Sequence, residues 1–542
     1  MIALLLFSVA LQTDASAPEG EPVLDPPTLH CLGVSWTVRG DDDRDARVEI
    51  AFRREGAWDW RPGPPLFRVE RGAARRDLPA GTWLFAGSVV GLDPGAPYEI
   101  RLTLIDPDGG RAERVLKART LAEPVAPPAL EEIRVRPGPR ALRDAARRAR
   151  PGTAILLHAG VYEAPLEVFS SGEPGRPIVW RAAGDGEAIL DAGGTGNGIV
   201  AAGVHDVWFE GLTVRRAVKG LTLPNSSRIV VRRCRFLGVT YGVFATVNDA
   251  GDVHGLFLSD NVIEGPCTWP RTKGIENARG IQVTGVGHVI AYNRIRGFAD
   301  AIDTLPSARC AAIDIHNNDV SEMTDDGIEL DYSERNVRCF ANRLTNVYQG
   351  ISAQPVYGGP AYVFRNVLYN VVEAPFKLHQ SPSGVLLYHN TVVKKGTPLV
   401  VATEHPVRNC VSRNNLFLGS AAPYAAQFEA PMVDCDFDAD GFGGGPWNLF
   451  LKWNGVRYAT LEEARAKAPA YRRAVVVATA GVRVPDDPAR AYPPEFDGRV
   501  PRDAGAADAG VRLPGFNDAY AGRAPDLGAV ENGAPPARYG PR

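Results

Sequence analysis

The chain is poor in the residue types that build metal and disulfide frameworks. Its 542 residues include 7 cysteines, 9 histidines and 3 methionines, and no two cysteines have the Cys-x-x-Cys spacing. Seven cysteines in a chain of this length do not make a disulfide framework, so we expect buried free thiols, chiefly at Cys234, Cys310, Cys339 and Cys410. The net charge of -3, with acidic and basic residues interspersed, leaves no basic stripe and excludes nucleic acid as an expected partner.

The chain also lacks a hydrophobic run long enough to span a bilayer. Residues 2–11, IALLLFSVAL, are apolar but too short, and the small residues of TDASA follow them. This order is typical of an export signal, and we predict a signal peptide over residues 1–17. The predicted location is secreted, periplasmic or on the cell surface, with no integral membrane segment, and we expect a monomer.

A regular spacing of asparagines dominates the second half of the chain. From Asn293 onward the steps are 25, 24, 24, 24 and 25 residues, and each asparagine precedes an apolar strand residue. Such a period has room for two or three strands but not for a long helix, which is typical of solenoids. We predict an all-β fold, a right-handed parallel β-helix of about ten coils, with left-handed asparagines whose amides stack at one bend. The seven positions are Asn261, Asn293, Asn318, Asn342, Asn366, Asn390 and Asn415.

A separate unit precedes the repeats. Residues 27–120 alternate apolar and polar residues and predict a β-sandwich. The spacing of Leu92, Pro94 and Tyr98 resembles the tyrosine corner of fibronectin type III domains, which implies a spacer or accessory module. The Pro-rich residues 121–132 predict a semi-rigid linker.

Segments at both ends of the repeats should protect the solenoid. We predict the β-helix over residues 133–420. An apolar face at Leu142, Ala145 and Ala146 predicts a helix that covers the open end of the first coil, which would otherwise expose sheet edges. Beyond residue 420 the period dissolves, and we expect residues 421–542 to be a C-terminal covering segment of mixed loops.

A column of outward-facing residues crosses five consecutive coils. Each coil repeats Gly or Ala, an apolar residue and a variable residue, as in RGIQV, DAIDT, DGIEL, QGISA and APFKL. Because successive side chains of a strand point to opposite faces, the variable residues should form a file at about 4.8 Å per coil. The file contains Gln282, Asp303, Glu329, Ser352 and Lys377.

Carboxylates crowd two adjacent rungs of this column, namely Asp300, Asp303, Asp325, Asp326 and Glu329. Unpaired like charges on neighbouring strands destabilise a sheet, so a counter-charge is expected. A hard cation such as Ca²⁺, which takes roughly six to eight oxygen ligands, suits an oxygen-rich and histidine-poor cluster. The alternative is a solvated acidic patch with Arg335 and Arg338 as local partners.

Two motifs resemble those of a known family. TDDGIEL at 324–330 and APFKLH at 374–379 are similar to the Asp-Asp-Gly-x-Asp and Gly-Phe-Lys-Leu motifs of the family 9 pectate lyases, which are parallel β-helices. The resemblance implies that Asp325, Asp326 and Glu329 hold calcium together with Asp300 or Asp303 from the preceding coil. It also implies that Lys377 is the base of a β-elimination. Glu329 stands where the family has aspartate, and His379 stands where it has glycine.

The chemistry of uronate cleavage accounts for these residue types. Removing the proton alpha to a uronate carboxylate requires that the charge of this carboxylate be offset, which a cation can do, and it requires a base such as lysine. His379 is a candidate catalytic residue that could donate to the leaving oxygen. Tyr332, Gln354 and Tyr357 are candidates for binding the sugar.

Three classes of function fit these observations. The first is an exported enzyme that cleaves an acidic, uronate-containing polysaccharide by calcium-assisted β-elimination, or an epimerase that shares the proton abstraction. The second is a glycoside hydrolase that uses paired carboxylates among Asp303, Asp325 and Asp326. The third is a non-catalytic, glycan-binding surface protein, since solenoid faces serve this role well.

Overall fold

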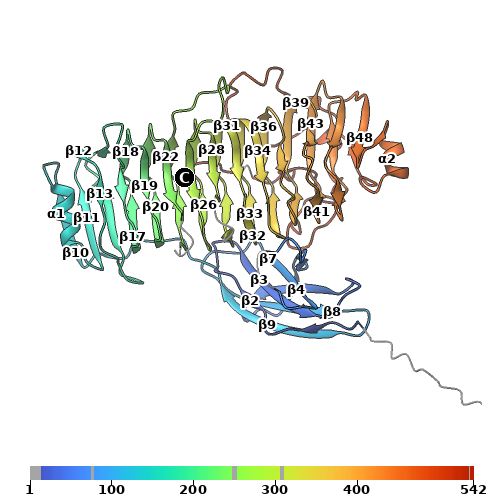
Figure 1. Cartoon of the computed structure of the whole chain (residues 1–542), viewed down its shortest axis with the longest axis horizontal. Coiled ribbons are helices and arrows are strands. Elements are labelled where there is room, and N and C mark those ends of the chain that lie inside the picture. The colour runs from blue at the N-terminus through green and yellow to red at the C-terminus, as the bar shows by residue number, and fades with distance from the viewer. Residues whose placement is uncertain (1–13, 75–77, 247–252, 306–309, 536) are drawn as a thin grey trace, which may run out of the picture.

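The computed structural model describes residues 14–542 except 75–77, 247–252, 306–309 and 536. The chain forms a long parallel β-helix with a β-sandwich packed against one side of it (Figure 1). The β-helix has about 12 turns, two more than the sequence predicts. The all-β prediction is confirmed.

Strands of one sheet form what we call the docking face of the β-helix, because the sandwich packs on it. Thirteen parallel strands make up this face. They are β10 (Glu131–Val135), β11 (Thr153–Leu157), β14 (Ile178–Ala182), β17 (His205–Glu210), β20 (Ser227–Arg232), β23 (Phe257–Ser259), β26 (Val289–Ala291), β30 (Asp314–His316), β33 (Val337–Phe340), β35 (Ala361–Phe364), β38 (Val385–Tyr388), β42 (Val411–Arg413) and β46 (Asp436–Phe437).

A second face, here called the tail face, follows the asparagine bend of each coil and carries the C-terminal segment. Its strands are β12 (Gly160–Glu163), β15 (Ala188–Asp191), β18 (Thr213–Arg215), β21 (Arg235–Leu237), β24 (Val262–Glu264), β27 (Arg294–Arg296), the first halves of β31 (Asp319–Glu329) and β34 (Arg343–Ala353), β36 (Val367–Val371), β39 (Thr391–Lys395), β43 (Leu416–Ser420), β47 (Gly441–Gly443) and β50 (Val475–Val476).

The third face, here called the open face, carries the predicted column. Its strands are β13 (Leu166–Glu167), β16 (Ile199–Val200), β19 (Lys219–Thr222), β22 (Tyr241–Ala245), β25 (Arg279–Val283), β28 (Asp300–Asp303), the second halves of β31 and β34, β37 (Phe376–Leu378), β40 (Leu399–Val401), β44 (Tyr424–Phe428) and β48 (Leu449–Trp453), beside which lies β49 (Val456–Tyr458). Short strands at the bends are β29 (Cys310–Ala311), β32 (Ser333–Arg335), β41 (Val407–Arg408) and β45 (Met432–Val433).

The asparagine ladder is confirmed in detail. Each side-chain amide nitrogen donates to the amide oxygen of the next asparagine along the stack at 2.9–3.0 Å, and all seven asparagines are buried. The ladder ends on Asp440, whose Oδ1 accepts from Asn415 at 3.0 Å. The left-handed residue is the one before each asparagine, such as Tyr292 and Arg365, so the expectation of left-handed ladder asparagines was wrong. The amide itself is what the bend requires, because it satisfies buried backbone groups.

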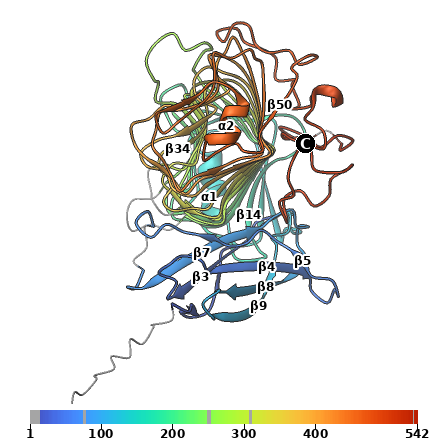
Figure 2. The same ribbon diagram turned by 90° about the vertical axis from the view of Figure 1, so that its right-hand side faces the viewer.

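Helices close the two ends of the stack (Figure 2). α1 (Ala141–Arg148) buries the predicted apolar face of Leu142, Ala145 and Ala146 against β10 and β13. α2 (Leu461–Lys467) lies at the far end and is capped by Thr460, whose side chain accepts from the backbone N–H of Glu463 at 3.1 Å. Neither of these described helices is long and apolar enough to cross a membrane.

The N-terminal unit is a sandwich of two antiparallel sheets. One contains β1 (Ala17–Pro18), β2 (Val23–Leu24), β3 (Leu32–Arg39), β6 (Phe67–Arg68) and β7 (Thr82–Val89), and the other contains β4 (Arg47–Arg54), β5 (Arg61–Pro62), β8 (Pro97–Ile105) and β9 (Arg111–Arg119). Tyr98 accepts from the backbone N–H of Asp93 at 3.0 Å, which is the kind of bond that a tyrosine corner makes.

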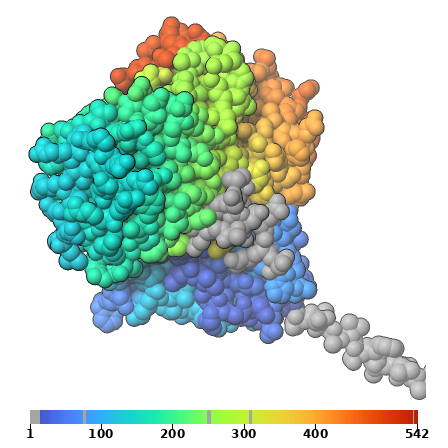
Figure 3. All heavy atoms as spheres, turned by 60° about the vertical axis from the view of Figure 1, so that its left-hand side comes forward, coloured from blue at the N-terminus to red at the C-terminus, as the bar shows by residue number. Residues whose placement is uncertain are grey.

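The sandwich is fixed to the docking face by buried polar contacts and lies directly beneath the β-helix (Figure 3). Arg338 on β33 pairs with Asp314 on β30 at 2.5 Å and also donates to Ser88 of the sandwich at 3.1 Å. The backbone N–H of Ser88 donates to the hydroxyl of Tyr362 at 3.1 Å.

The predicted segment boundaries compare with the structure as follows. Residues 1–13 of the predicted signal peptide lie outside the described residues, and Ala17–Pro18 pairs with β3. Stacked strands begin at Glu131, within the predicted linker, and continue past residue 420 to Val476. All seven cysteines are free, and six are buried.

Candidate metal and catalytic site

The open face carries the predicted column in the predicted register. Gln282 pairs with Asp303, Glu329 with Ser352, and Ser352 with Lys377. Ile302 opposite Ile328 places Asp303 beside Glu329. The alternation along each strand and the stacking of the coils therefore bring Gln282 and Lys377, almost a hundred positions apart in sequence, onto one line.

The five predicted carboxylates lie together in two overlapping groups. Oxygens of Asp300, Asp303 and Glu329 lie within 4.8 Å of one another, and so do oxygens of Asp300, Asp325 and Asp326. All are buried except Asp325, which is half-buried. Since Asp300 belongs to both groups, the cluster is continuous across the two rungs.

An arginine that the sequence analysis missed pairs with this cluster. Arg279 on β25 lies 3.2 Å from Asp300 and 2.8 Å from Asp303. Its register position opposite Asp300 could have been found, because it precedes Gln282 by three residues, as Asp300 precedes Asp303. A second arginine, Arg271, reaches from the loop between β24 and β25 to Asp325 at 3.6 Å.

The predicted partners Arg335 and Arg338 do not contact the cluster, so that part of the acidic-patch alternative was wrong. Arg335 pairs with Asp25 of the sandwich at 2.9 Å, and Arg338 is used in the sandwich interface. Arg335 ends β32 at a bend and Arg338 lies on β33 of the docking face, because each coil turns away from the open face before it reaches them.

Several carboxylate oxygens remain without a hydrogen bond despite the arginines. Oδ1 of Asp326, Oε2 of Glu329 and Oδ2 of Asp303 are buried and have no hydrogen-bond partner among the residues that the structure describes. For Asp303 the nearby Nε of Arg279 offers charge at 2.8 Å but no aligned hydrogen bond. Buried polar atoms normally have partners, so these oxygens are suited to bind a hard cation.

Burial changes the protonation of these carboxyls. It raises the pKa of Asp303 to about 7 and that of Asp331 to about 8. It also raises the pKa of Asp300 and Glu329 well above the ordinary values. The charges of neighbouring carboxylates raise both pKa values further. A bound cation would reverse this direction, because it favours the ionised form.

Lys377 reaches across a rung to the carboxylate cluster. Its Nζ lies 2.6 Å from Oδ2 of Asp326. Burial lowers the pKa of Lys377, but the charges of Asp326, Asp331 and Asp325 raise it by more, so the net pKa lies above the ordinary value. A lysine base needs the opposite direction, and this pairing keeps the ammonium protonated at neutral pH.

The other predicted site residues follow the column strands of their coils. The backbone N–H of Gln354 donates to Asp331 at 2.7 Å. The rings of Tyr332 and Tyr357 are half-buried with centroids 6.2 Å apart. His379 lies two residues after Lys377 and is half-buried. Its burial, and to a smaller extent the charge of Lys377, lowers its pKa.

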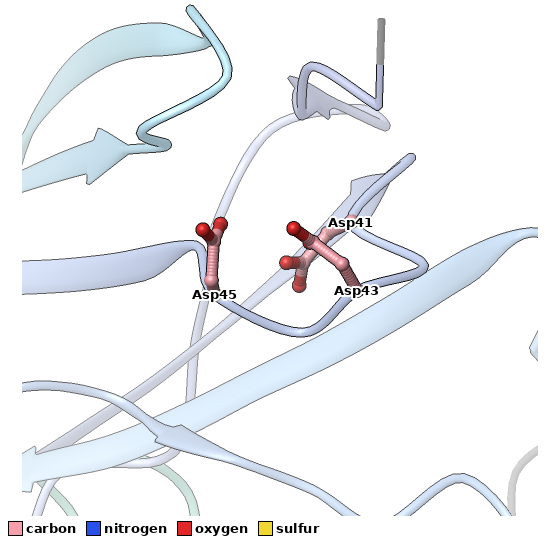
Figure 4. Close-up of side chains that lie close together, drawn as sticks. All are labelled: Asp41, Asp43 and Asp45. Atoms are coloured by element: carbon pink, nitrogen blue, oxygen red, sulfur yellow. The ribbon is translucent and has the colours of Figure 1, made fainter. Parts of the chain in front are cut away.

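Another acidic group lies in the sandwich, where Asp41, Asp43 and Asp45 share one loop (Figure 4). Asp43 and Asp45 are exposed, whereas the buried Asp41 is neutralised by Arg68. Asp41 also accepts from the backbone N–H of Ala46 at 2.9 Å. Its buried oxygens are therefore satisfied, unlike those of the rung cluster.

Comparisons with known proteins find similarity in the β-helix. A profile of the family described as periplasmic copper-binding protein (NosD) matches residues 182–394, less than half of the chain. The solved structure of a PL6 family alginate lyase, AlyGC, is similar at 14% identity and a TM-score of 0.36, covering 60% of this chain and 49% of the lyase. A mutant of that lyase gives 16% identity and a TM-score of 0.33, covering 58% and 48%.

The chain therefore spans about half the length of the alginate lyase that it matches. No curated protein sequence matches the chain. The matches given above include neither a family 9 pectate lyase nor a fibronectin type III domain.

Proposed function

We propose that this protein is an exported carbohydrate-active enzyme that cleaves an acidic polysaccharide by cation-assisted β-elimination. One observation carries the proposal. Buried carboxylate oxygens without hydrogen-bond partners among the described residues converge, beside a lysine, on a face of the β-helix other than those under the sandwich and the C-terminal segment. A uronate polymer supplies both the proton to be removed and the negative charge that such a site must offset.

The residues of the chain would divide the reaction as follows. Lys377 takes the proton alpha to the uronate carboxylate, the freed electron pair forms a carbon–carbon double bond, and the bond to the β-oxygen breaks. His379, Tyr332 or Tyr357 returns a proton to the leaving oxygen. Arg279 adds positive charge beside Asp300, where it also holds the cluster in place.

Asp300, Asp303, Asp325, Asp326 and Glu329 would hold the cation, which we propose to be Ca²⁺. Lys377 can lose its proton only when Asp326 no longer pairs with it, and a bound cation would supply the competing charge. The copper named for the NosD family is a poorer fit here, because copper prefers imidazole and sulfur ligands. The cluster offers carboxylate oxygens alone.

The remaining parts of the proposal concern location and the N-terminal unit. The short apolar run at residues 2–11 and the periplasmic description of the NosD family support export to the periplasm or cell surface. The bond between Tyr98 and Asp93 supports a fibronectin type III-like sandwich with an accessory role. We propose that the exported protein is a monomer.

A glycoside hydrolase is the second candidate, and the raised pKa values favour it in one respect. A carboxyl with a pKa near 7, such as Asp303, could act as a general acid at neutral pH. The carboxyl pair of a retaining glycosidase stands roughly 5 to 5.5 Å apart and that of an inverting one farther. Oxygens within 4.8 Å of one another suit one shared cation better than a bond cleaved between them.

The test is incubation of the protein with a panel of uronate polymers, with and without a chelator. Ultraviolet absorbance from a conjugated product, lost on chelation and restored by Ca²⁺, is the expected result. New reducing ends without absorbance would replace the lyase by a hydrolase. If neither signal appears with any polymer, the glycan-binding alternative gains instead.

A further inference from the structure

We propose that Lys219, Tyr241 and Phe244 form a subsite for an acidic sugar on the open face, towards the N-terminal end of the stack from the carboxylate cluster. The proposal rests on the proposed function, because it places the next sugars of the same polysaccharide. It extends that function by giving the substrate a direction along the solenoid.

The register places this subsite on the same line as the cluster. Phe244 pairs with Gln282, and Gln282 pairs with Asp303. Phe244 is therefore two strands from Asp303, roughly 10 Å along the stack. Tyr241 pairs in turn with Arg279, the arginine that holds the cluster. A chain lying along the column would meet both sites.

Two half-buried aromatic rings offer an apolar surface. The rings of Tyr241 and Phe244 meet edge to face, with centroids 5.5 Å apart and planes at 86°. This geometry is favourable for an aromatic pair and keeps both rings in fixed positions. The apolar C–H side of a sugar ring can pack against such a surface, whereas its hydroxyls stay in water.

Lys219 gives the subsite its charge preference. Its ammonium lies 3.6 Å from the centroid of Phe244 and 5.9 Å from that of Tyr241, so aromatic rings, not a carboxylate, are its described neighbours. A cation placed on rings keeps most of its charge available for a ligand. A uronate carboxylate beside Phe244 is therefore complementary to this position.

Further polar groups fit a sugar ligand and connect the two sites. The hydroxyl of Thr222, next to Phe244 in the register, is buried and has no hydrogen-bond partner within the described residues. Asn277 accepts from the Tyr241 hydroxyl at 2.9 Å and from Arg279 at 2.7 Å. The same amide thus positions an aromatic ring of the subsite and the arginine of the cluster.

The opposite direction along the stack offers less positive charge. Beyond Lys377 the outward positions of β40 and β44 are Val400 and Gln427, and Gln427 pairs in register with Lys452. Lys452 is already neutralised by Glu429. An acidic chain is therefore better matched on the Lys219 side.

The experiment measures binding of uronate oligomers of increasing length, and of neutral oligomers of the same lengths, by calorimetry. All proteins carry Lys377→Arg to limit cleavage. Lys219→Ala should weaken binding of long acidic oligomers about tenfold, which corresponds to roughly 1.4 kcal/mol. Binding of short acidic oligomers and of neutral oligomers should weaken less. Phe244→Ala should weaken the binding of both acidic and neutral long oligomers. The matched control is Lys467→Ala, since Lys467 is an exposed lysine on the distant α2.

Unchanged affinity in Lys219→Ala and Phe244→Ala would overturn the subsite, and an equal loss for acidic and neutral oligomers in Lys219→Ala would overturn its charge preference. Thermal melting confirms that each variant is folded. The outcomes also separate this proposal from the proposed function. If the wild type shows turnover and the variants bind oligomers as tightly as their parent, the subsite alone is removed. If the wild type shows no turnover, but Lys219→Ala weakens the binding of acidic oligomers more as they lengthen, the subsite is supported and the lyase is removed.

Discussion

At the scale of single residues, Lys377 is the group on which the proposed elimination depends. Lys377→Arg keeps the charge beside Asp326 but supplies a guanidinium, which does not lose its proton near neutral pH. We expect turnover to fall by at least about 100-fold, as is typical of losing a general base, with little change in substrate affinity. Steady-state kinetics on the polymer that the wild type cleaves would measure this.

The pH profile gives an independent check on the same residue. Because the neighbouring carboxylates raise the pKa of Lys377, wild-type activity should rise with pH, and saturating Ca²⁺ should move this rise to lower pH. Lys395→Arg, on the exposed end of β39, is the control and should behave as the wild type. A Lys377→Arg enzyme with most of its turnover would instead favour the carboxylate hydrolase.

Two of the three carboxyls with unpaired oxygens, Glu329 and Asp326, should respond differently to neutralisation. Glu329→Gln replaces a buried carboxyl whose Oε2 has no hydrogen-bond partner among the described residues, so without metal the melting temperature should stay equal or rise. Asp326→Asn leaves Lys377 without its counter-charge and should lower the melting temperature. Ca²⁺ should stabilise the wild type by mass action, about 2.7 kcal/mol at 100 times the dissociation constant, and should stabilise both variants less.

Calorimetric titration with Ca²⁺ and scanning calorimetry measure the two effects. Mg²⁺ at equal concentration serves as a control, because it is smaller and dehydrates reluctantly. Unaltered Ca²⁺ affinity in both variants would remove the metal site while leaving the β-helix untouched.

Much of the candidate site could be predicted because two periods determine it. Alternation along a strand decides which side chains point outward, and the coil period decides which of them stack. Arg279 obeys the same rule, since it lies in register opposite Asp300, whereas the expected partners Arg335 and Arg338 are near the carboxylates in sequence but not in register. Arg271 could not be placed, since it comes from an irregular loop with no period. The pairing of Lys377 with Asp326 depends on the reach of a long side chain, which register alone does not give.

At the scale of structural elements, the asparagine ladder ties the coils together. Asn366 donates to the carbonyl of Cys339 at 2.9 Å and to Asn390 at 3.0 Å, and it accepts from the backbone N–H of Asn342 at 3.0 Å. Asn366→Leu leaves these buried groups without partners, each costing about 1 to 3 kcal/mol. Thermal unfolding should therefore show a large loss of stability.

The control for this change is Asn448→Leu. Asn448 is exposed and outside the ladder, and its backbone is not left-handed, so leucine adds no strain there. Equal melting temperatures for the two variants would mean that the amide column does not hold the coils together.

Asp440, at the end of the ladder, makes stability depend on pH. Burial raises its pKa to about 7, although Ser412 and Asn415 donate to it. The unfolded carboxyl ionises near pH 4, so between about pH 4 and pH 7 the folded state holds the extra proton and stability falls as pH rises. Asp440→Asn should reduce this fall and raise the melting temperature at pH 8, because it continues the ladder without a charge.

Melting curves from pH 4 to pH 8 on both proteins provide the measurement. Asp434→Asn, outside the ladder, should leave the slope unchanged. A slope identical in wild type and Asp440→Asn would assign the pH dependence to other buried carboxyls, such as Asp303 and Asp331.

At the scale of the whole molecule, the β-helix has one face under the sandwich, one under the C-terminal segment and a third that neither of them covers in the part of the chain that the structure describes. The tail packs on Tyr369, Val393 and Leu416 of the tail face, and Arg542 reaches back to Asp260. The sequence predicts a C-terminal covering segment but not which face it covers, because contacts between irregular segments carry no period. The carboxylate cluster lies on the face that, within the described residues, is under neither the sandwich nor the C-terminal segment, which is where the proposed polymer would bind.

The last prediction concerns the attachment of the sandwich to the docking face. Arg338 and Asp314 are fully buried, and Arg338 also donates to Ser88 and Thr28 across the interface. Arg338→Met leaves Asp314 as an unpaired buried charge, which costs about 3 to 5 kcal/mol, whereas adding Asp314→Leu removes that charge and should restore most of the loss. Scanning calorimetry measures both, with the exposed Arg134→Met as control. Because the double variant still lacks the bonds to Ser88 and Thr28, its sandwich should be cut faster by protease than that of the wild type. Wild-type stability and protection in Arg338→Met would show that apolar packing alone fixes the sandwich to the β-helix.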